Sequence, residues 1–150
     1  PAVNPGISVS RVGGNAQTKA MKKVAGSLKL LYSQYRELQS FAQFGSDLDA
    51  DTKARLAQGE RIVEVLKQDR NSPISMEHQV CILYAVTHDL LKDVAVEDVK
   101  EYEHGLYAYM GGHAPDVLET IRTSGKLEKD TETALAAALA EYTTEFLKTK

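Results

Sequence analysis

Little in this chain of 150 residues supports an exported, membrane-spanning or nucleic-acid-binding protein. Its single cysteine, Cys81, cannot form an internal disulfide, so the sequence does not support an oxidising compartment. Cys81 lies in an apolar run, where we expect a buried thiol. No apolar run reaches the roughly 18 residues that a membrane-spanning helix needs. The net charge of −3 is unsuited to neutralising nucleic-acid phosphates.

Residue patterns that carry chemistry are also sparse. The four histidines are scattered, and none has a partner at a recognised metal-ligand spacing. Among the clustered Glu97, Asp98, Glu101 and Glu103, Glu97 and Glu101 share a helix face, where like charges repel and are usually solvated. The cluster is therefore not expected to form an acid/base pair. Gly13 and Gly14 fit neither of the glycine-rich phosphate-binding motifs. The sequence therefore predicts no complete active site within this chain.

From residue 15 onward the apolar pattern is helical. Apolar side chains recur every three or four positions in six segments, which we expect to be helices. They cover residues 15–44, 50–68, 75–91, 96–110, 115–124 and 127–150. The connections between them are short. We therefore predict an all-α domain, a multi-helix superhelical bundle preceded by a short extended segment.

The first of these helices is the longest, on the order of 40 Å. Asn15 is its expected N-cap, and its apolar stripe is expected to continue through Phe41 and Phe44. Gly26 could bend it, because glycine costs about 1 kcal/mol relative to alanine in a helix. Glycines are also the expected helix ends. They are Gly45, the pair Gly111 and Gly112, and Gly125.

Residues 1–14 differ from the rest, with two prolines and three glycines around the alternating run Ile7–Ser10. A lone strand leaves its ladder groups unpaired, so we expect a strand or loop that joins a sheet formed elsewhere. The missing initial methionine fits either removal of that residue or a chain that is part of a longer protein, and the resemblance described below favours the second. Arg11 follows this run and precedes two glycines. It is either an outward-facing phosphate ligand on a stiff base or an ordinary surface arginine.

The residues PAVNPGISVSR (1–11) resemble the signature of the alpha and beta subunits of rotary ATPases. That signature has a proline, an acidic or amide residue at the fourth position, and Ser-x-Ser at its end. The continuation through FAQFGSDLD (41–49) is similar to the alpha subunit of F-type ATP synthases in particular. The likeness continues more loosely through ERIVEVLKQDRNSPISMEHQV (60–80) and weakens after about residue 90.

This resemblance implies a regulatory, non-catalytic nucleotide-binding subunit of the rotary, proton-transporting ATP synthase. In that family, alpha and beta subunits alternate around a central rotor, and the catalytic sites lie mainly on beta. The position that matches the family's arginine finger is Arg11, supplied in trans to the nucleotide phosphates. Residues 1–14 would end the nucleotide-binding domain, and residues 15–150 would form the C-terminal helical domain. The complex would lie peripherally on the cytoplasmic face of a bacterial membrane, or on the matrix or stroma side in an organelle.

Two further sites follow from the resemblance. In the family two glutamines contact the adenine of a nucleotide that is not turned over. Gln68 matches the first, whereas Arg70 replaces the second, although an arginine can stack on a base. The turn with Asp47, Asp49 and Asp51 matches the family's rotor-facing turn. It is either a rotor contact or a solvated loop whose charges suit a helix N-terminus.

The resemblance also implies ligands and partners. MgATP or MgADP is expected in the whole subunit, and no cofactor in the isolated fragment. The expected partners are beta subunits, the central gamma rotor subunit and the peripheral delta subunit or its equivalent, without nucleic acid or direct membrane insertion. Activity as an H⁺-transporting ATPase is expected only in the assembled complex, so the isolated fragment should be inactive.

Two other interpretations compete with this one. A free-standing helical interaction module would be a monomer whose residues 1–14 form a mobile tail, and removing the tail would leave its stability unchanged. A small helical enzyme of unknown type would turn over substrate by itself. Screening the isolated protein for nucleotide hydrolysis distinguishes the second of these from the alpha-subunit interpretation.

Overall fold

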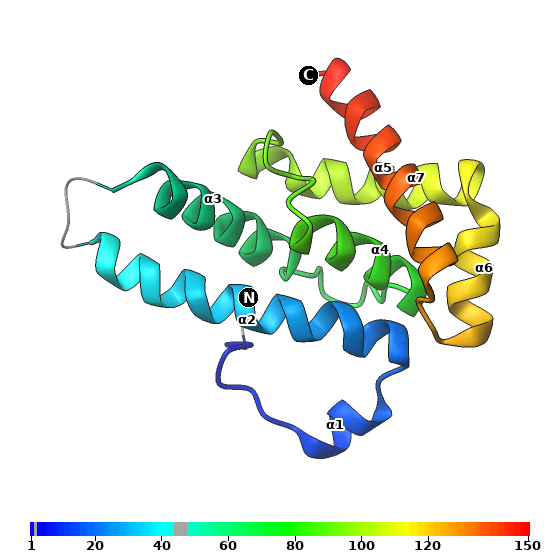
Figure 1. Cartoon of the computed structure of the whole chain (residues 1–150), viewed down its shortest axis with the longest axis horizontal. Helices are drawn as coiled ribbons and strands as arrows, with labels where there is room; N and C mark the ends of the chain where they lie inside the picture. Colours follow the sequence, from blue (N-terminus) through cyan, green and yellow to red (C-terminus); the bar gives the residue numbers. More distant parts are fainter. Residues whose placement is uncertain (2, 44–47) are drawn as a thin grey trace.

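The computed structural model describes residues 1, 3–43 and 48–150. Along the sequence they form α1 (Arg11–Ala16), α2 (Lys19–Ala42), α3 (Ala50–Val65), α4 (Met76–Thr87), the 3₁₀ turn η1 (Val96–Asp98), α5 (Val99–His113), α6 (Pro115–Ser124) and α7 (Lys129–Lys148). Figure 1 shows α2 and α3 side by side as an antiparallel pair that extends from a body built of α4 to α7. The all-α prediction is confirmed, and the described residues contain no strand.

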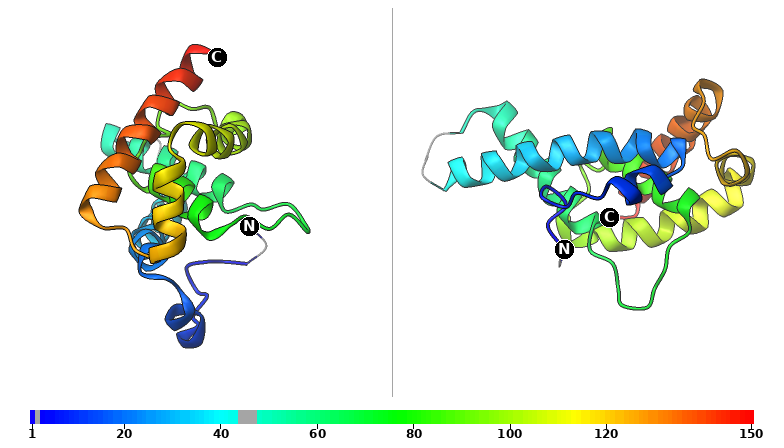
Figure 2. Two further views of the ribbon diagram at one scale, coloured as in Figure 1. Left: turned by 90° about the vertical axis from the view of Figure 1, so that its right-hand side faces the viewer. Right: turned by 90° about the horizontal axis from the view of Figure 1, so that it is seen from below.

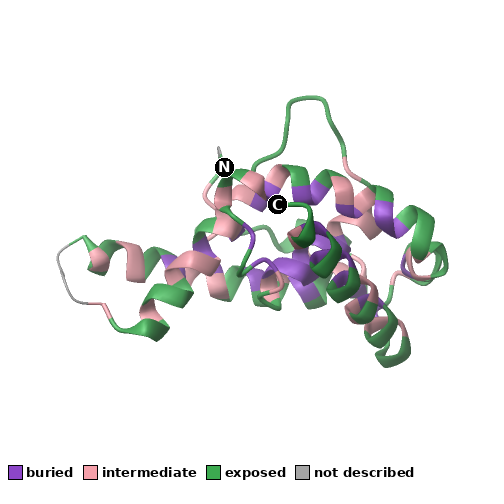
Figure 3. Ribbon diagram, turned by 90° about the horizontal axis from the view of Figure 1, so that it is seen from above, coloured by how far each residue is buried: buried purple, intermediate pink, exposed green. Residues whose placement is uncertain are grey.

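Helix α4 lies at the centre of the body. It packs against α2, α3, α5, α6 and α7, and its residues Val80–Val86 are all buried. A helix segment enclosed on every side is expected to be apolar all round, as Val80–Val86 is. Cys81 is one of these residues, which confirms the predicted buried thiol. Figure 3 shows the buried residues gathered in the centre of the molecule, whereas the outer ends of α2 and α3 are mainly exposed or half-buried.

The long second helix begins at Lys19, so the prediction that Asn15 caps it was wrong. Thr18 is the N-cap, and its hydroxyl oxygen accepts a hydrogen bond from the Met21 N–H at 3.2 Å. Asn15 lies within α1, whose N-cap is Ser10. Two capping side chains thus divide one apolar pattern into two helices. From Lys19 onward α2 continues through Gly26 without a break.

The buried stripe of α2 stops before the helix ends. Its last buried residue is Tyr35, whereas Phe41 is 70% exposed, contrary to the predicted stripe. The reason is that the end of α2 extends beyond the body with only α3 alongside it (Figure 1). Phe44 and Gly45, which were expected to close the helix, lie outside the described residues.

Glycine ends one helix as predicted but not another. Gly125 has a left-handed φ of 62° at the C-cap of α6, a conformation that glycine adopts without strain. Gly111 and Gly112, however, lie inside α5. That helix ends at His113, because the next residue, Ala114, precedes Pro115 and a residue before proline avoids the helical conformation. Helices α3 and α4 each end about one turn earlier than predicted.

Candidate functional site

Arg11 is exposed and lies outside the helical body. It is the first residue of α1, a short helix that contains no buried residue. The N-cap Ser10 accepts a hydrogen bond from the Gly13 N–H at 2.9 Å, which fixes the first turn around the arginine. Figures 1 and 2 show α1 set apart from the body, next to the start of α2. The guanidinium is therefore carried on a capped turn at the surface.

The residues beside Arg11 expose large apolar side chains. Ile7 is 78%, Val9 84% and Val12 81% exposed. The run Ile7–Ser10 pairs with no strand in the described part of the protein. Three large, exposed apolar side chains thus lie within four residues of Arg11 in the sequence.

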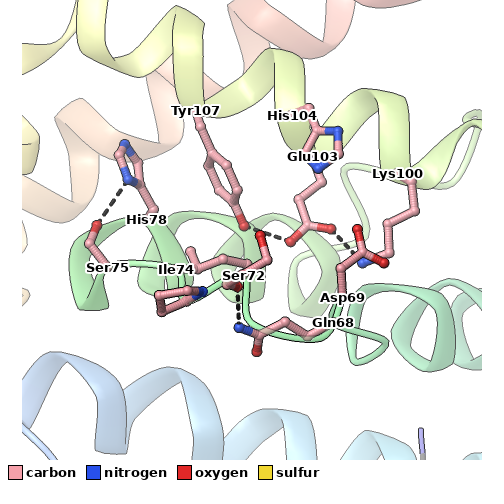
Figure 4. A pocket seen from close by; sticks show the side chains of 11 residues that line it. Gln68, Asp69, Ser72, Ile74, Ser75, His78, Lys100, Glu103, His104 and Tyr107 are labelled. Carbon is pink, nitrogen blue, oxygen red and sulfur yellow. Dashed lines mark hydrogen bonds and ion pairs between the residues drawn. The ribbon is translucent and has the colours of Figure 1, made fainter.

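A cavity of about 510 Å³ lies between α5 and the connection from α3 to α4 (66–75). Figure 2 shows this connection projecting from the body, and Figure 4 shows the cavity between it and α5. The volume is in the range of small-molecule sites. Gln68 lines the cavity, and its amide nitrogen donates to the Ser72 carbonyl oxygen at 2.6 Å. Arg70 is exposed on the same connection and does not line the cavity.

The α5 wall of this cavity is a charge-balanced group of three side chains. Glu103 is only 2% exposed. One of its oxygens lies 2.8 Å from the Lys100 ammonium, and the other accepts a hydrogen bond from the Tyr107 hydroxyl at 2.7 Å. Burial, and then the bond to Glu103, raise the pKa of the Tyr107 phenol well above its usual value. Glu97 and Glu101, for which solvation was predicted, are exposed. Glu103 is buried because Lys100 and Tyr107 on the same helix face satisfy its carboxylate.

His78 forms part of the opposite wall, at the start of α4. Its Nδ1 lies 2.9 Å from the Ser75 hydroxyl oxygen, and its ring lies 4.9 Å from the Tyr107 ring, centroid to centroid. Its Nε2 is buried and has no hydrogen-bond partner among the described residues. The His78 and Tyr107 rings thus pack against each other where they line the cavity. The described residues contain no cluster of histidine, cysteine and carboxylate groups that could hold a metal ion.

In the acidic turn, Asp49 is the N-cap of α3. Its carboxylate accepts hydrogen bonds from the Thr52 N–H at 2.8 Å and the Thr52 hydroxyl at 2.9 Å. These bonds hold the pKa of Asp49 below its usual value. Asp51 is exposed in the first turn of the same helix, where its charge suits the helix dipole. Asp47 lies outside the described residues, and a rotor contact for this turn stays a prediction.

Sequence reasoning located Arg11 and Gln68 but missed the rest of the cavity. Lys100, Glu103 and Tyr107 had a usable signal, because spacings of three and four residues bring opposite charges and hydrogen-bonding groups together on a helix. His78 had no such signal.

None of the described helices is both long and apolar enough to cross a membrane.

Comparison with known proteins identifies the family. The family model of the ATP synthase alpha/beta chain, C terminal domain, matches residues 17–142. The "ATP synthase subunit alpha, sodium ion specific" of Acetobacterium woodii is 53% identical over 148 residues. That match covers 99% of this chain and 30% of the relative, so the chain spans about a third of the relative's length. The resemblance to the alpha subunit is confirmed, and the protein belongs to the family of C-terminal domains shared by the alpha and beta subunits of ATP synthases.

Proposed function

We propose that this protein acts as the C-terminal part of an ATP synthase alpha subunit and supplies Arg11 to the nucleotide phosphates in a neighbouring beta subunit. The observation that carries the proposal is an exposed Arg11 on a capped turn, in a sequence 53% identical to an alpha subunit. A guanidinium is always charged and donates in a planar fork that matches phosphoryl oxygens. Held at that site, it would stabilise the charge that develops during phosphoryl transfer.

The surroundings of Arg11 support a role at a subunit contact. A finger supplied in trans must lie where another subunit approaches closely enough to exclude water. The exposed side chains of Val9 and Val12 on either side of Arg11 provide an apolar rim for such a contact. The same side chains would be unfavourably hydrated if this segment faced only solvent.

We also propose a regulatory role, in which Gln68 contributes to binding a nucleotide that is not turned over. In the whole subunit, which would hold MgATP or MgADP, the Gln68 side chain would contact the adenine from the cavity beside α5. Arg70, exposed nearby, would stack on the base in place of the family's second glutamine. The phosphate-binding loop is not among these residues, so the isolated protein should bind MgATP weakly and hydrolyse none.

The proposed setting is an ion-translocating complex that lies peripherally on a membrane, on its cytoplasmic, matrix or stroma side. In it this protein would contact beta subunits, the gamma rotor through the turn at Asp49 and Asp51, and the delta subunit or its equivalent. The relative from Acetobacterium woodii is named as sodium ion specific. For the protein described here, the proton as coupling ion stays a prediction.

The proposal is tested by substituting Arg11 in the assembled complex. Arg11→Ala should lower steady-state ATP hydrolysis by about 10³–10⁵-fold, the usual value of an arginine finger. Arg11→Lys should retain little of the rate, because an ammonium keeps the charge but not the planar fork. Hydrolysis is measured on complexes whose subunit composition matches wild type.

A matched control is Arg36→Ala. Arg36 is also an exposed arginine, and its guanidinium contacts only Gln39 on the same helix, at 2.9 Å, among the described residues. This variant should hydrolyse ATP at the wild-type rate. A wild-type rate in a fully assembled Arg11→Ala complex would exclude the finger role.

A further inference from the structure

The start of α2 is held by residues more than a hundred positions away in the sequence. The Ala20 N–H donates to the Gly125 carbonyl oxygen at 2.9 Å. The Lys23 ammonium lies 2.5 Å from a Glu132 carboxylate oxygen and 3.5 Å from the Leu127 carbonyl oxygen. We name these five residues the α2 clamp. It ties the first turns of α2 to the connection between α6 and α7 and to the first turn of α7.

The α2 clamp lies next to the link that leads back to Arg11. Only Gln17 and Thr18 separate α1 from α2. A Cβ atom added to Gly125 would lie 3.4 Å from Thr18 side-chain atoms, so the clamp lies directly against this link. The Thr18 hydroxyl also donates to the Met76 sulfur at 3.5 Å, which ties the link to the start of α4.

Helix α1, in contrast, has no buried residue of its own. The segment before α1 also contacts the body. The Lys29 ammonium of α2 donates a hydrogen bond to the Ser8 carbonyl oxygen at 3.4 Å. The path of the backbone from the body to Arg11 therefore depends on where Thr18 and the first turn of α2 are held. A shift of α2's first turn would carry Arg11 with it.

We infer that the α2 clamp is a positioning device for Arg11, and that Lys23 and Glu132 are positioning residues of the arginine finger. This inference rests on the proposed function of Arg11. A group that stabilises a transition state must be held closely, because a misplacement of about 1 Å can cost about 10²-fold in rate. The α6–α7 connection thereby contributes to hydrolysis without touching nucleotide.

The ion pair in the clamp allows positioning to be separated from folding. The Lys23 side chain is 49% exposed and that of Glu132 is 26% exposed. Ion pairs this exposed add little to the stability of a fold, because water screens them. A change in this pair should therefore alter the rate of hydrolysis while the thermal unfolding midpoint of the complex stays near that of wild type.

The test uses Lys23→Glu in the assembled complex, which places like charges opposite each other. We expect kcat for ATP hydrolysis to fall about tenfold, an intermediate misplacement of the finger, with KM for ATP unchanged. The exchange Lys23→Glu with Glu132→Lys restores the attraction and should return kcat to within about twofold of wild type. If Lys23→Glu does not assemble, Glu132→Gln removes the attraction without repulsion and should lower kcat in the same direction.

The decisive comparison adds Lys23→Glu to Arg11→Ala. Because the clamp acts through Arg11, the double variant should be no slower than Arg11→Ala alone. Arg122→Glu is the control. It breaks an exposed ion pair with Glu119 inside α6, and should leave the rate at the wild-type value.

Three results would overturn the inference. They are a wild-type kcat in Lys23→Glu, losses that multiply in the double variant, and a failure of the charge exchange to restore the rate. Each leaves the finger role intact if Arg11→Ala is impaired. A wild-type rate in Arg11→Ala instead removes the proposed function itself, and the positioning role with it.

Discussion

The segment around Arg11 and helix α4 use apolar side chains in opposite ways. In α4, Val80–Val86 are all buried against neighbouring helices. Around Arg11, Ile7, Val9 and Val12 are exposed and bury little surface within the protein. Apolar burial in α4 stabilises the fold, whereas the same residue types beside Arg11 fit a contact with another subunit. The fold and the proposed function therefore depend on different regions.

The largest expected effect comes from shortening an apolar side chain in the core around α4, compared with the same change beside Arg11. Leu139 of α7 is fully buried in the same core, so Leu139→Ala should lower the free energy of unfolding by about 2–5 kcal/mol. Val12→Ala at the exposed segment should change it by no more than about 0.5 kcal/mol. Urea denaturation of the 150-residue protein measures both values. Similar losses at the two positions would mean that the segment around Arg11 is part of the fold.

Two glycines extend the comparison to helix packing. A Cβ atom at Gly59 would overlap the Tyr35 ring, so Gly59→Ala forces α2 and α3 apart and should cost about 1–3 kcal/mol. Gly26, on α2, has no atom within 4 Å of the same added carbon. Gly26→Ala should therefore stabilise the protein by about 0.5–1 kcal/mol, because alanine is the better helix former. Thermal unfolding measures both variants. If both substitutions moved the unfolding midpoint in the same direction, the described packing of α2 against α3 would be contradicted.

A smaller effect comes from the buried thiol of α4. Burial raises the pKa of Cys81 from 9.0 to about 12. Above pH 9 the unfolded state loses this proton while the folded state keeps it, so the unfolded state binds fewer protons and stability falls as pH rises. By pH 10 this should lower the free energy of unfolding by about 1.4 kcal/mol. Cys81→Ala should lack that loss between about pH 8 and pH 10, and an unchanged pH dependence in this variant would refute the assignment.

Helix boundaries could be predicted where the local signal is strong. Pro115 and Gly125 enclose α6 at the predicted positions, because a proline suits the first helical turn and a glycine suits the left-handed C-cap. Gly111 and Gly112 misled the prediction, because glycine only weakens a helix and α5 is held by burial on its other face. The start of α2 was missed because Asn15 and Thr18 are both good caps, and sequence alone does not decide between them.

The residues of the candidate site also differ in whether the sequence could predict them. Arg11 could be singled out because residues 1–11 resemble the rotary ATPase signature, whereas its position after a short alternating run left an ordinary surface arginine open. The cavity beside Gln68 could not, because α5 reaches it from about thirty residues further along the sequence. The contact between α5 and the Gln68 connection depends on how the helices pack, and the apolar periodicity of a single helix carries no information about that packing. Of the cavity residues, only Lys100, Glu103 and Tyr107 have a helical spacing from which their contacts could have been predicted.

The length of α2 has a mechanical consequence. Its 24 residues form one uninterrupted helix about 36 Å long. The Arg11 segment adjoins its first turn, and its other end extends beyond the body with α3 alongside it (Figure 1). Because the helix has no break at Gly26, a load on its far end would tilt the helix as one piece instead of bending it. The turn that follows α6 would then serve as the fulcrum of a lever whose short arm carries the arginine.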